Sequence, residues 1–211
     1  MDLKQARQHF DQRALPEDRA KPVFHGVDGY DVYNPSIPFW WRGKRYIFGR
    51  VERRSEWTRS WVRLFHETAR DQWSLVDGSM IYQLEDPYIA IIGDELVMGG
   101  THVRNNKGQL DTYYGYFYRG RDLHDLYSFT TGPDCMKDIR LVQMLDGRIG
   151  VFSRPRSEEI LKLFGSESMV GFQIIDSLDD LSAEIVSSAP LLSGMFREDL
   201  SRWSGQASVP D

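Results

Sequence analysis

A repeat of about 50 residues limits the architecture of this chain more than any other feature of its sequence. Each unit contains an Asn or Asp residue, an apolar strand, a turn glycine and a second apolar strand. The three turn glycines, Gly43, Gly93 and Gly147, are separated by 50 and 54 residues. This is about the length of one four-stranded propeller blade with its loops. The repeat therefore predicts a β-propeller.

Charged and polar residues repeat together with the strands. The first strand of each unit begins with an Asx residue, and the second strand ends seven positions beyond the turn glycine. The Asx residues are Asn34, Asp86 and Asp138, and the later positions hold Arg50, Gly100 and Arg154. Because antiparallel pairing brings the start of the first strand beside the end of the second, these side chains should gather at one rim.

The remaining segments predict an all-β fold. Short β-branched and aromatic runs complete each unit, the last of them "SAEIVSSAP" over residues 182–190, and only residues 2–14 and the "SLDDLS" turn look helical. A jelly roll or sandwich would contain similar strands, but it would not explain the repeat. We therefore expect a partly helical N-terminal segment over 1–25, propeller blades over 26–196 and a polar C-terminal tail over 197–211.

The number of repeats is smaller than a closed ring needs. The chain is expected to hold about three blades and the start of a fourth, whereas enzymatic propellers of the five-bladed type need more. We interpret this as a C-terminal truncation or an open ring. An open ring exposes a strand edge, which favours a homo-oligomer.

Composition excludes several classes of function. A formal net charge of −5 and a pI near 5.6 disfavour a nucleic-acid partner. No apolar run approaches the roughly 20 residues that span a bilayer, so no membrane partner is expected. The single cysteine, Cys135, excludes a disulfide framework and is compatible with a cytoplasmic location. The five histidines include no pair at metal-ligand spacing, so no metal site is predicted.

Four segments carry a resemblance to known families: "GYDVYNPSIPF", "GRVERRSEW", "LEDPYIAIIGDELVMGG" and "MKDIRLVQMLDGRIGVFSRP". They resemble domain of unknown function family 1861 and, more distantly, the five-bladed propellers of glycoside hydrolase family 130. The distant link rests on Asn34-Pro35 leading to Arg50, Glu85-Asp86-Pro87, and Lys137-Asp138 followed by Arg154-Pro155. The family 130 pattern continues its Glu-Asp-Pro motif with an arginine, where this chain has Tyr88.

The resemblance implies that Asp86 is the proton donor toward a glycosidic oxygen. A general acid has to keep its proton near neutral pH, which requires a desolvated or anionic surrounding. Glu85 would supply that anion. An alternative role needs no catalysis, because Asp before Pro commonly starts a turn and accepts backbone hydrogen bonds.

A second set of residues is implied to hold inorganic phosphate, which would replace water as the attacking group. The set comprises Arg50, Lys137 and Arg154, whose cationic groups suit phosphate oxygens. The alternative is that these cations form ion pairs with Glu52, Asp86 and Asp138 and join neighbouring blades. No cofactor is expected apart from phosphate as a possible co-substrate.

The expected ligand is a carbohydrate. Candidate sugar-binding residues are Asn34, Glu85, Tyr88, His102 and Asp138. The resemblance implies inverting phosphorolysis or hydrolysis of a β-mannoside-like glycoside. The alternative is a propeller that binds carbohydrate or takes part in assembly without catalysis.

Overall fold

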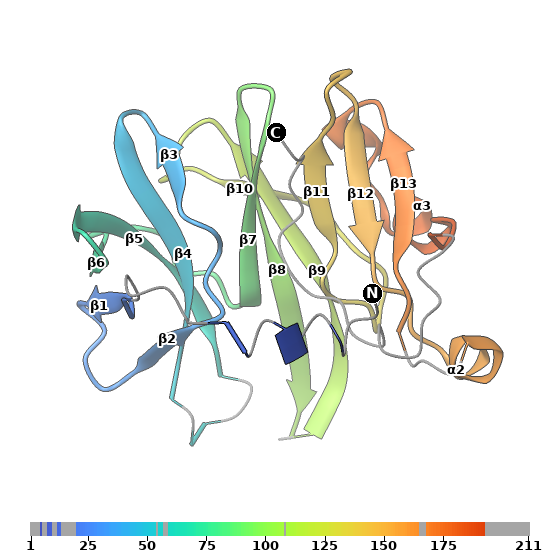
Figure 1. Ribbon diagram of the computed structural model, residues 1–211, viewed down its shortest axis with the longest axis horizontal. Helices are drawn as coiled ribbons and strands as arrows, with labels where there is room; N and C mark the ends of the chain where they lie inside the picture. Colours follow the sequence, from blue (N-terminus) through green and yellow to red (C-terminus); the bar gives the residue numbers. More distant parts are fainter. Residues whose placement is uncertain are drawn as a thin grey trace.

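The computed structural model describes residues 5, 8–9, 12–13, 20–53, 55–56, 59–107, 109–164 and 168–192. Most of the helix predicted over residues 2–14, the start of a fourth blade and the tail predicted over 197–211 lie outside these ranges. Within them the chain is mostly β, as predicted, and its strands form three sheets that stand side by side (Figure 1). No helix in the described part of the chain is long and apolar enough to cross a membrane.

The first sheet has the strand order β1-β6-β5-β4-β2, with β3 also paired to β4. Its strands are β1 (Val23–His25), β2 (Asp31–Tyr33), β3 (Phe39–Trp41), β4 (Lys44–Glu52), β5 (Trp61–Ala69) and β6 (Gln72–Leu75). All pairings are antiparallel except that of β1 with β6, which is parallel. The first and last strands of this sheet in the sequence, β1 and β6, therefore lie next to each other at one edge of the sheet.

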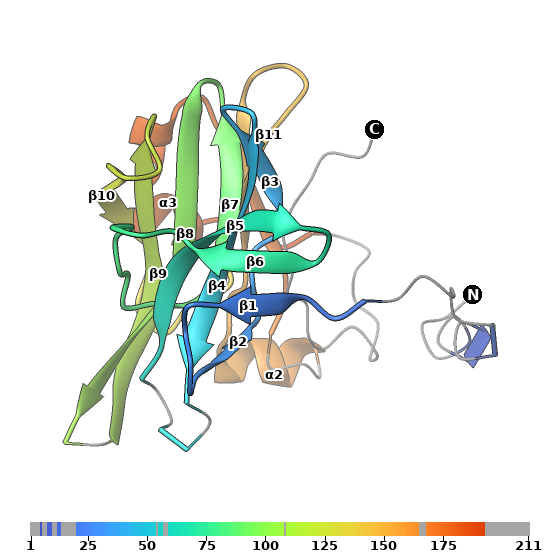
Figure 2. The same cartoon turned by 90° about the vertical axis from the view of Figure 1, so that its left-hand side faces the viewer.

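The second and third sheets are antiparallel throughout. The second has the order β10-β9-β8-β7, from β7 (Glu85–Ile92), β8 (Glu95–Asn106), β9 (Gln109–Gly120) and β10 (Tyr127–Thr131). The third has the order β11-β12-β13, from β11 (Arg140–Gln143), β12 (Ile149–Ser153) and β13 (Gly171–Ile175). The ends of β8 and β9 extend beyond the other strands (Figures 1 and 2).

The three predicted hairpins are confirmed. Gly43, Gly93 and Gly147 lie in the β3–β4, β7–β8 and β11–β12 turns, with φ of 78°, 60° and 89°. This left-handed backbone is one that glycine adopts without the steric cost of a Cβ atom. The turn glycines thus set the register of the leading strands in all three sheets.

One predicted strand is wrong. Residues 182–190 contain α3 (Ala183–Ser187) instead, which follows the short 3₁₀ helix η1 (Leu178–Asp180) at the predicted "SLDDLS" turn. The Ser182 hydroxyl caps α3 by accepting a hydrogen bond from the Ile185 N–H, and Val186 packs into the core. A capping serine favours the helix over the strand here. A further helix in the described part of the chain is α2 (Glu158–Phe164).

Alternating side chains divide the core into layers. On β4, Phe48 packs toward the second sheet, whereas Ile47 and Val51 pack on the opposite, outer face of the first sheet. Tyr88 and Leu141 belong to a further cluster between the second and third sheets. This is the period of two expected for strands covered on both faces.

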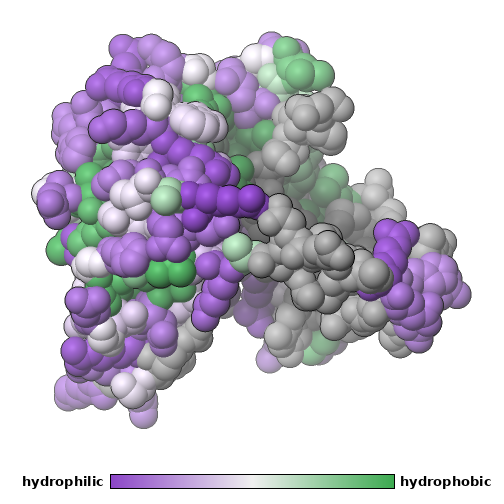
Figure 3. Space-filling view, turned by 60° about the vertical axis from the view of Figure 1, so that its left-hand side comes forward, coloured by the Kyte–Doolittle hydropathy of each residue, from purple (hydrophilic) through white to green (hydrophobic). Residues whose placement is uncertain are grey.

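On the side shown in Figure 3, hydrophilic residues dominate and hydrophobic residues form separate patches.

Candidate functional site

The three repeated Asx residues share an unusual backbone conformation. Asn34, Asp86 and Asp138 all have positive φ, at 43°, 49° and 61°. Left-handed backbone costs a residue with a Cβ about 1–2 kcal/mol, although Asn and Asp tolerate it best. Strain of this kind concentrates at functional sites. Asn34 follows β2, Asp86 lies in a bulge of β7, and Asp138 precedes β11, so each sheet has one of these Asx residues in or beside a strand at its edge.

Asp86 lies at the meeting point of the three units. Its Oδ1 atom accepts hydrogen bonds from Asn34 Nδ2 at 2.8 Å and from Arg50 Nη1 at 3.1 Å. Lys137 Nζ lies 4.0 Å from its Oδ2 atom. The structure therefore brings together predicted residues from all three hairpins at one rim.

Arg50 is held from several sides. Its Nε and Nη2 atoms donate to Glu52 Oε2 at 3.0 and 2.6 Å, and Nε also donates to Ser60 Oγ at 3.0 Å. Nη2 lies 3.1 Å from Glu85 Oε1. Ser60 in turn donates a short hydrogen bond to Glu52. With Glu52 only 3% exposed, this is a buried, hydrogen-bonded ion pair of fixed geometry.

These contacts shift the pKa of each partner. Burial by itself lowers the pKa of Arg50, but the hydrogen bond to Glu52 and the charges of Glu85 and Asp86 outweigh it and raise that pKa. Burial tends to raise the pKa of Glu52, yet hydrogen bonds from Ser60 and Arg50 bring that pKa below its ordinary value. For Glu85, burial, reinforced by the charge of Asp86, outweighs the attraction of Arg50 and raises the pKa.

The third hairpin contributes a second buried ion pair. Arg154 forms a close ion pair with Asp138, and Arg140 Nη2 lies 3.6 Å from Asp138 Oδ1. The Arg154 Nε atom is buried and has no hydrogen-bond partner in the described structure. Asp138 is 4% exposed, so its carboxylate contacts the two arginines and has almost no contact with solvent.

We refer to these eight side chains as the ionic cluster, which consists of Arg50, Glu52, Glu85, Asp86, Lys137, Asp138, Arg140 and Arg154. Four cations face four carboxylates. The ion pairs that were the alternative to a phosphate site are therefore present: Arg50 with Glu52, and Arg154 with Asp138. These ion pairs do not explain why the buried Arg154 Nε atom has no hydrogen-bond partner in the described structure.

Tyr88 does not join this site, which corrects the prediction that it contacts sugar. It is 1% exposed, and its ring lies against Gly99 and under the Arg140 guanidinium, 4.8 Å from the ring centroid. The bulge between Glu85 and Tyr88 shifts the register and turns the ring into the core. A ligand cannot reach it there.

His102 lies on the neighbouring strand, beside the cluster. Its Nδ1 atom is 3.1 Å from the Gln83 carbonyl oxygen, and its ring packs 5.3 Å from that of Tyr114. The preceding residue, Thr101, pairs with Glu85 across β7 and β8. His102 is thus placed next to the rim but is held by its own sheet.

Two members of the site were not predicted. Ser60 carries no motif, because its role depends on a contact between β4 and the start of β5. Arg140 does leave a sequence signal, as a charge inside the apolar run "IRLVQ", where a buried cation needs a partner. Among the described residues, no group of three His, Cys, Asp or Glu side chains could hold a metal ion.

The raised pKa of Glu85 gives a testable pH dependence. The folded protein holds this proton more tightly than the unfolded chain does, so the associated stability is present below the ordinary pKa of 4.5 and is lost as pH rises through the folded value. We expect Glu85→Gln, which does not titrate, to gain melting temperature relative to wild type as pH rises from about 4 to about 7. Thermal unfolding at several pH values measures this.

Glu52→Gln provides the contrast, because the pKa of Glu52 is lowered and its contribution is lost as pH falls. Its melting temperature should approach that of wild type on the acid side. Parallel curves for wild type and Glu85→Gln would contradict the assignment of a raised pKa to Glu85.

Comparisons with known proteins give one family match. A family model described as "Protein of unknown function (DUF1861)" matches residues 8–209. A comparison with curated proteins gives no match.

Solved structures give closer parallels. MPT-4, a mannose phosphorylase from Leishmania mexicana in complex with phosphate ion, is 49% identical with a TM-score of 0.82. MPT-1, a GDP-Man-dependent mannosyltransferase from Leishmania mexicana, is 43% identical with a TM-score of 0.78. Each match covers 90% of this chain and 57% of the other, so the chain spans little more than half the length of these proteins.

A more distant likeness concerns the fold alone. The β-1,2-mannobiose phosphorylase from Listeria innocua, in its β-1,2-mannobiose complex, is 13% identical with a TM-score of 0.51. The match covers 74% of this chain and 58% of the other. The arrangement of sheets is therefore shared with carbohydrate-active enzymes over part of their length.

Proposed function

This chain belongs to the DUF1861 family, and on that premise we propose that it is part of a glycoside-processing enzyme built on a five-bladed type of propeller. In this proposal the three sheets are three blades, with β2, β7 and β11 nearest the central channel. The substrate is a β-mannoside-like glycoside, and the attacking group is inorganic phosphate or water. The sequence similarity to a mannose phosphorylase supports the substrate class.

One observation carries the proposal: all three Asx residues of the equivalent hairpins have left-handed backbone, and Asp86 contacts Asn34, Arg50 and Lys137 from the two other units. A set of purely structural ion pairs gives no reason to keep left-handed backbone at all three positions. A site that aims side chains at a common ligand does. The similarity to a protein crystallised with phosphate adds weight to an anion as one ligand.

Asp86 acts as the general acid in this mechanism. It gives its proton to the glycosidic oxygen while a phosphate oxygen attacks the anomeric carbon from the opposite face. The bond from that carbon to the leaving sugar breaks, a bond to phosphate forms, and the configuration inverts. Asp86 is left as a carboxylate, which Asn34 and Arg50 are placed to stabilise by hydrogen bonds.

The remaining cluster residues bind and orient. Arg50, Lys137 and Arg154 hold phosphate, and the Arg154 Nε donor has no hydrogen-bond partner in the described structure. Asp138 orients Arg154, and Asn34, Glu85 and His102 contact sugar hydroxyls. Glu52 and Ser60 fix Arg50 from behind.

Two other functions have observations in their favour. The balance of four cations and four carboxylates suits a carbohydrate-binding propeller without catalysis. The similarity to MPT-1 suits transfer of a mannosyl group from a nucleotide sugar. Incubating the protein with manno-oligosaccharides and phosphate, with oligosaccharides alone, and with GDP-mannose and an acceptor separates these cases. An α-configured sugar phosphate seen by NMR only with phosphate present supports phosphorolysis, and no turnover in any mixture contradicts an enzyme.

The phosphate site makes a separate prediction. A ligand that binds only the folded protein stabilises it by about 1.4 kcal/mol at ten times its dissociation constant. For a chain of this size that corresponds to a rise of about 3–6 °C in melting temperature. We expect millimolar phosphate to produce such a rise, measured by calorimetry.

Arg154→Met should abolish this rise, because it removes the donor that the ion pair leaves free. Arg148→Met is the matched control, since Arg148 lies at the opposite end of the same hairpin, exposed and paired with Asp146. An equal rise in wild type and Arg154→Met would leave Arg154 as a structural ion pair.

A further inference from the structure

The β8–β9 hairpin continues past the rim at which the ionic cluster lies. β7 begins at Glu85, which pairs with Thr101, whereas β8 runs on to Asn106. Residues 102–106 of β8 and 109–114 of β9 therefore form a two-stranded extension, which we call the arm (Figures 1 and 2). Its described residues belong to none of the three core clusters, so core packing does not account for it.

The base of the arm is tied to the two segments that lead into the ionic cluster. His102 Nδ1 lies 3.1 Å from the carbonyl oxygen of Gln83, in the segment that leads into β7. On the other strand, the Tyr113 carbonyl oxygen accepts a hydrogen bond of 2.8 Å from the Cys135 N–H, in the segment that leads into β11. The arm therefore has a fixed position relative to the cluster residues of both segments.

The face of the arm toward the first sheet ends a row of aromatic rings. Tyr118 and Tyr116 pack against the core between the first and second sheets, with ring centroids 5.2 Å apart. Tyr114 and His102 continue the row onto the arm, 5.3 Å from each other and 6.2 Å from Tyr116. These last two rings are only half-buried. The row thus leaves the core and presents aromatic surface beside the cluster.

The two rings on the arm combine apolar and polar contacts. The Gln83 carbonyl oxygen can only accept a hydrogen bond, so His102 Nδ1 carries the proton and Nε2 of the neutral ring is an acceptor. Tyr114 adds an aromatic ring and a hydroxyl. Arg104, the next cation along β8, is neutralised by Asp111, with Nε donating to Oδ2 at 2.6 Å. A neutral ligand with hydroxyl groups and apolar C–H groups suits this surface better than an anion.

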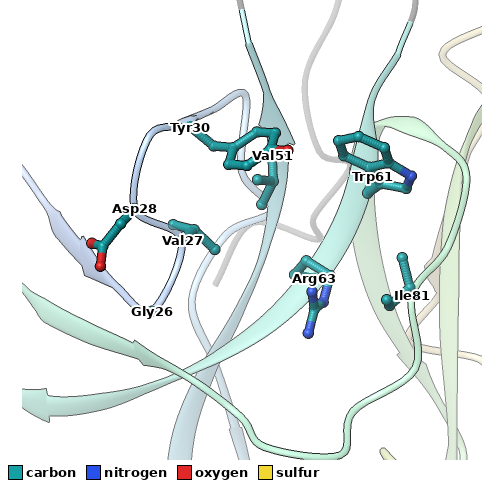
Figure 4. Close-up of a pocket in the computed structure, with 8 residues that line it drawn as sticks. All are labelled: Gly26, Val27, Asp28, Tyr30, Val51, Trp61, Arg63 and Ile81. Carbon is teal, nitrogen blue, oxygen red and sulfur yellow. The ribbon is translucent and has the colours of Figure 1, made fainter.

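A cavity of about 340 Å³ at another place differs from this surface in what covers it (Figure 4). Tyr30, Trp61 and Arg63 are among its lining residues, on the outer face of the first sheet. In the ring proposed above, a further blade packs on that face. The aromatic face of the arm is directed instead toward the first sheet, which is the neighbouring unit of the same ring. No further blade lies between two neighbouring units.

We propose that Tyr114 and His102 form a subsite for the leaving part of the substrate, a mannose unit beyond the bond that Asp86 protonates. The inference rests on the proposed function. Phosphate attacks from the opposite face of the anomeric carbon, so the leaving sugar lies on the side of Asp86. The C–H face of that sugar covers the Tyr114 ring, and one of its hydroxyls donates a hydrogen bond to His102 Nε2.

Kinetics with substrates of different length test the subsite. Tyr114→Ala should raise the KM for a β-linked mannotriose by about 5- to 30-fold, the effect of losing one well-packed aromatic contact. The kcat should change little, because the contact is the same in the ground state and the transition state. Methyl β-mannoside has no second sugar ring, so its kinetics should be the same in both proteins. Tyr114→Phe keeps the ring and should retain most of the affinity.

Tyr127→Ala is the matched control. Tyr127 is an exposed tyrosine of the same sheet, on β10 at the edge away from β7. Its substitution should leave the KM for mannotriose unchanged.

Binding measurements separate failure of the subsite from failure of the proposed function. We expect calorimetric titration with mannotriose, without phosphate, to show binding, and NMR of the wild-type protein to show NOEs between Tyr114 ring protons and sugar C–H protons. Such NOEs without turnover would contradict the enzyme but keep the sugar site. Turnover with an equal KM in wild type and Tyr114→Ala would overturn the subsite but keep the enzyme. A wild-type protein that binds no mannotriose at millimolar concentration would also overturn the subsite.

Discussion

Asp86→Asn is expected to lower turnover of a manno-oligosaccharide by about 10²- to 10⁴-fold, the usual contribution of a general acid. The amide keeps the shape of the side chain and can still accept the hydrogen bonds from Asn34 and Arg50. It cannot give a proton to the leaving oxygen. A nitrophenyl glycoside, whose leaving group needs little protonation, should lose much less activity.

The control for this experiment is Asp94→Asn. Asp94 lies in the turn at the other end of the β7–β8 hairpin, where it is exposed and paired with Arg121. Its substitution should leave turnover unchanged on both substrates. If Asp86 only starts a turn, Asp86→Asn should instead lower the free energy of unfolding by about 0.5–2 kcal/mol. Unchanged turnover on the oligosaccharide would remove Asp86 from the role of acid.

Glu52→Gln is expected to produce the largest loss of stability. It removes the carboxylate that holds two nitrogens of Arg50, in a pair that is almost fully buried. Removing one partner of a buried ion pair costs about 3–5 kcal/mol. We expect the lower end, because Glu85 and Asp86 remain beside Arg50. A loss of about 3 kcal/mol lowers the melting temperature of a chain this size by about 6–12 °C.

Glu67→Gln is the matched control, since it breaks the pair between Glu67 on β5 and Arg45 on β4. That pair is partly exposed, and pairs of this kind contribute about 0–1 kcal/mol. Denaturant unfolding of both variants gives the two free energies. Equal losses in the two variants would show that burial of the Arg50 pair adds nothing to its contribution.

The leading hairpins could be predicted because their signals are local. Gly43, Gly93 and Gly147 each mark a turn that glycine adopts easily, and the apolar runs on either side fix the strands. The Asx residues follow the same register, so the contact between Asn34 and Asp86 also follows from chain position. The strand predicted over residues 182–190 was wrong because its local signal is ambiguous. A short apolar run fits a strand or a helix, and the cap at Ser182 decided between them.

Contacts between sheets could not be predicted from local sequence patterns. Tyr88 looked available because it follows a motif, yet a bulge of the kind at Asp86 reverses the face of every residue after it. The ion pairs of Arg140 and the hydrogen bonds of Ser60 join segments whose approach depends on the whole fold. From the sequence alone, the residue types of Arg140 and Ser60 indicate only that these side chains need hydrogen-bond or ion-pair partners when buried.

The parallel pairing of β1 with β6 has a consequence for the order of assembly. Val23 pairs with Gln72, so the outer edge of the first sheet joins residues that are 49 positions apart. During synthesis β1 emerges first but has to wait for β6, and the loop between them contains the other four strands of that sheet. Closing so long a loop costs entropy before any contact is gained. β1 is thus the first strand of the sheet to be synthesised and the last to pair. Until it pairs, the edge of β6 remains open to pairing with another chain.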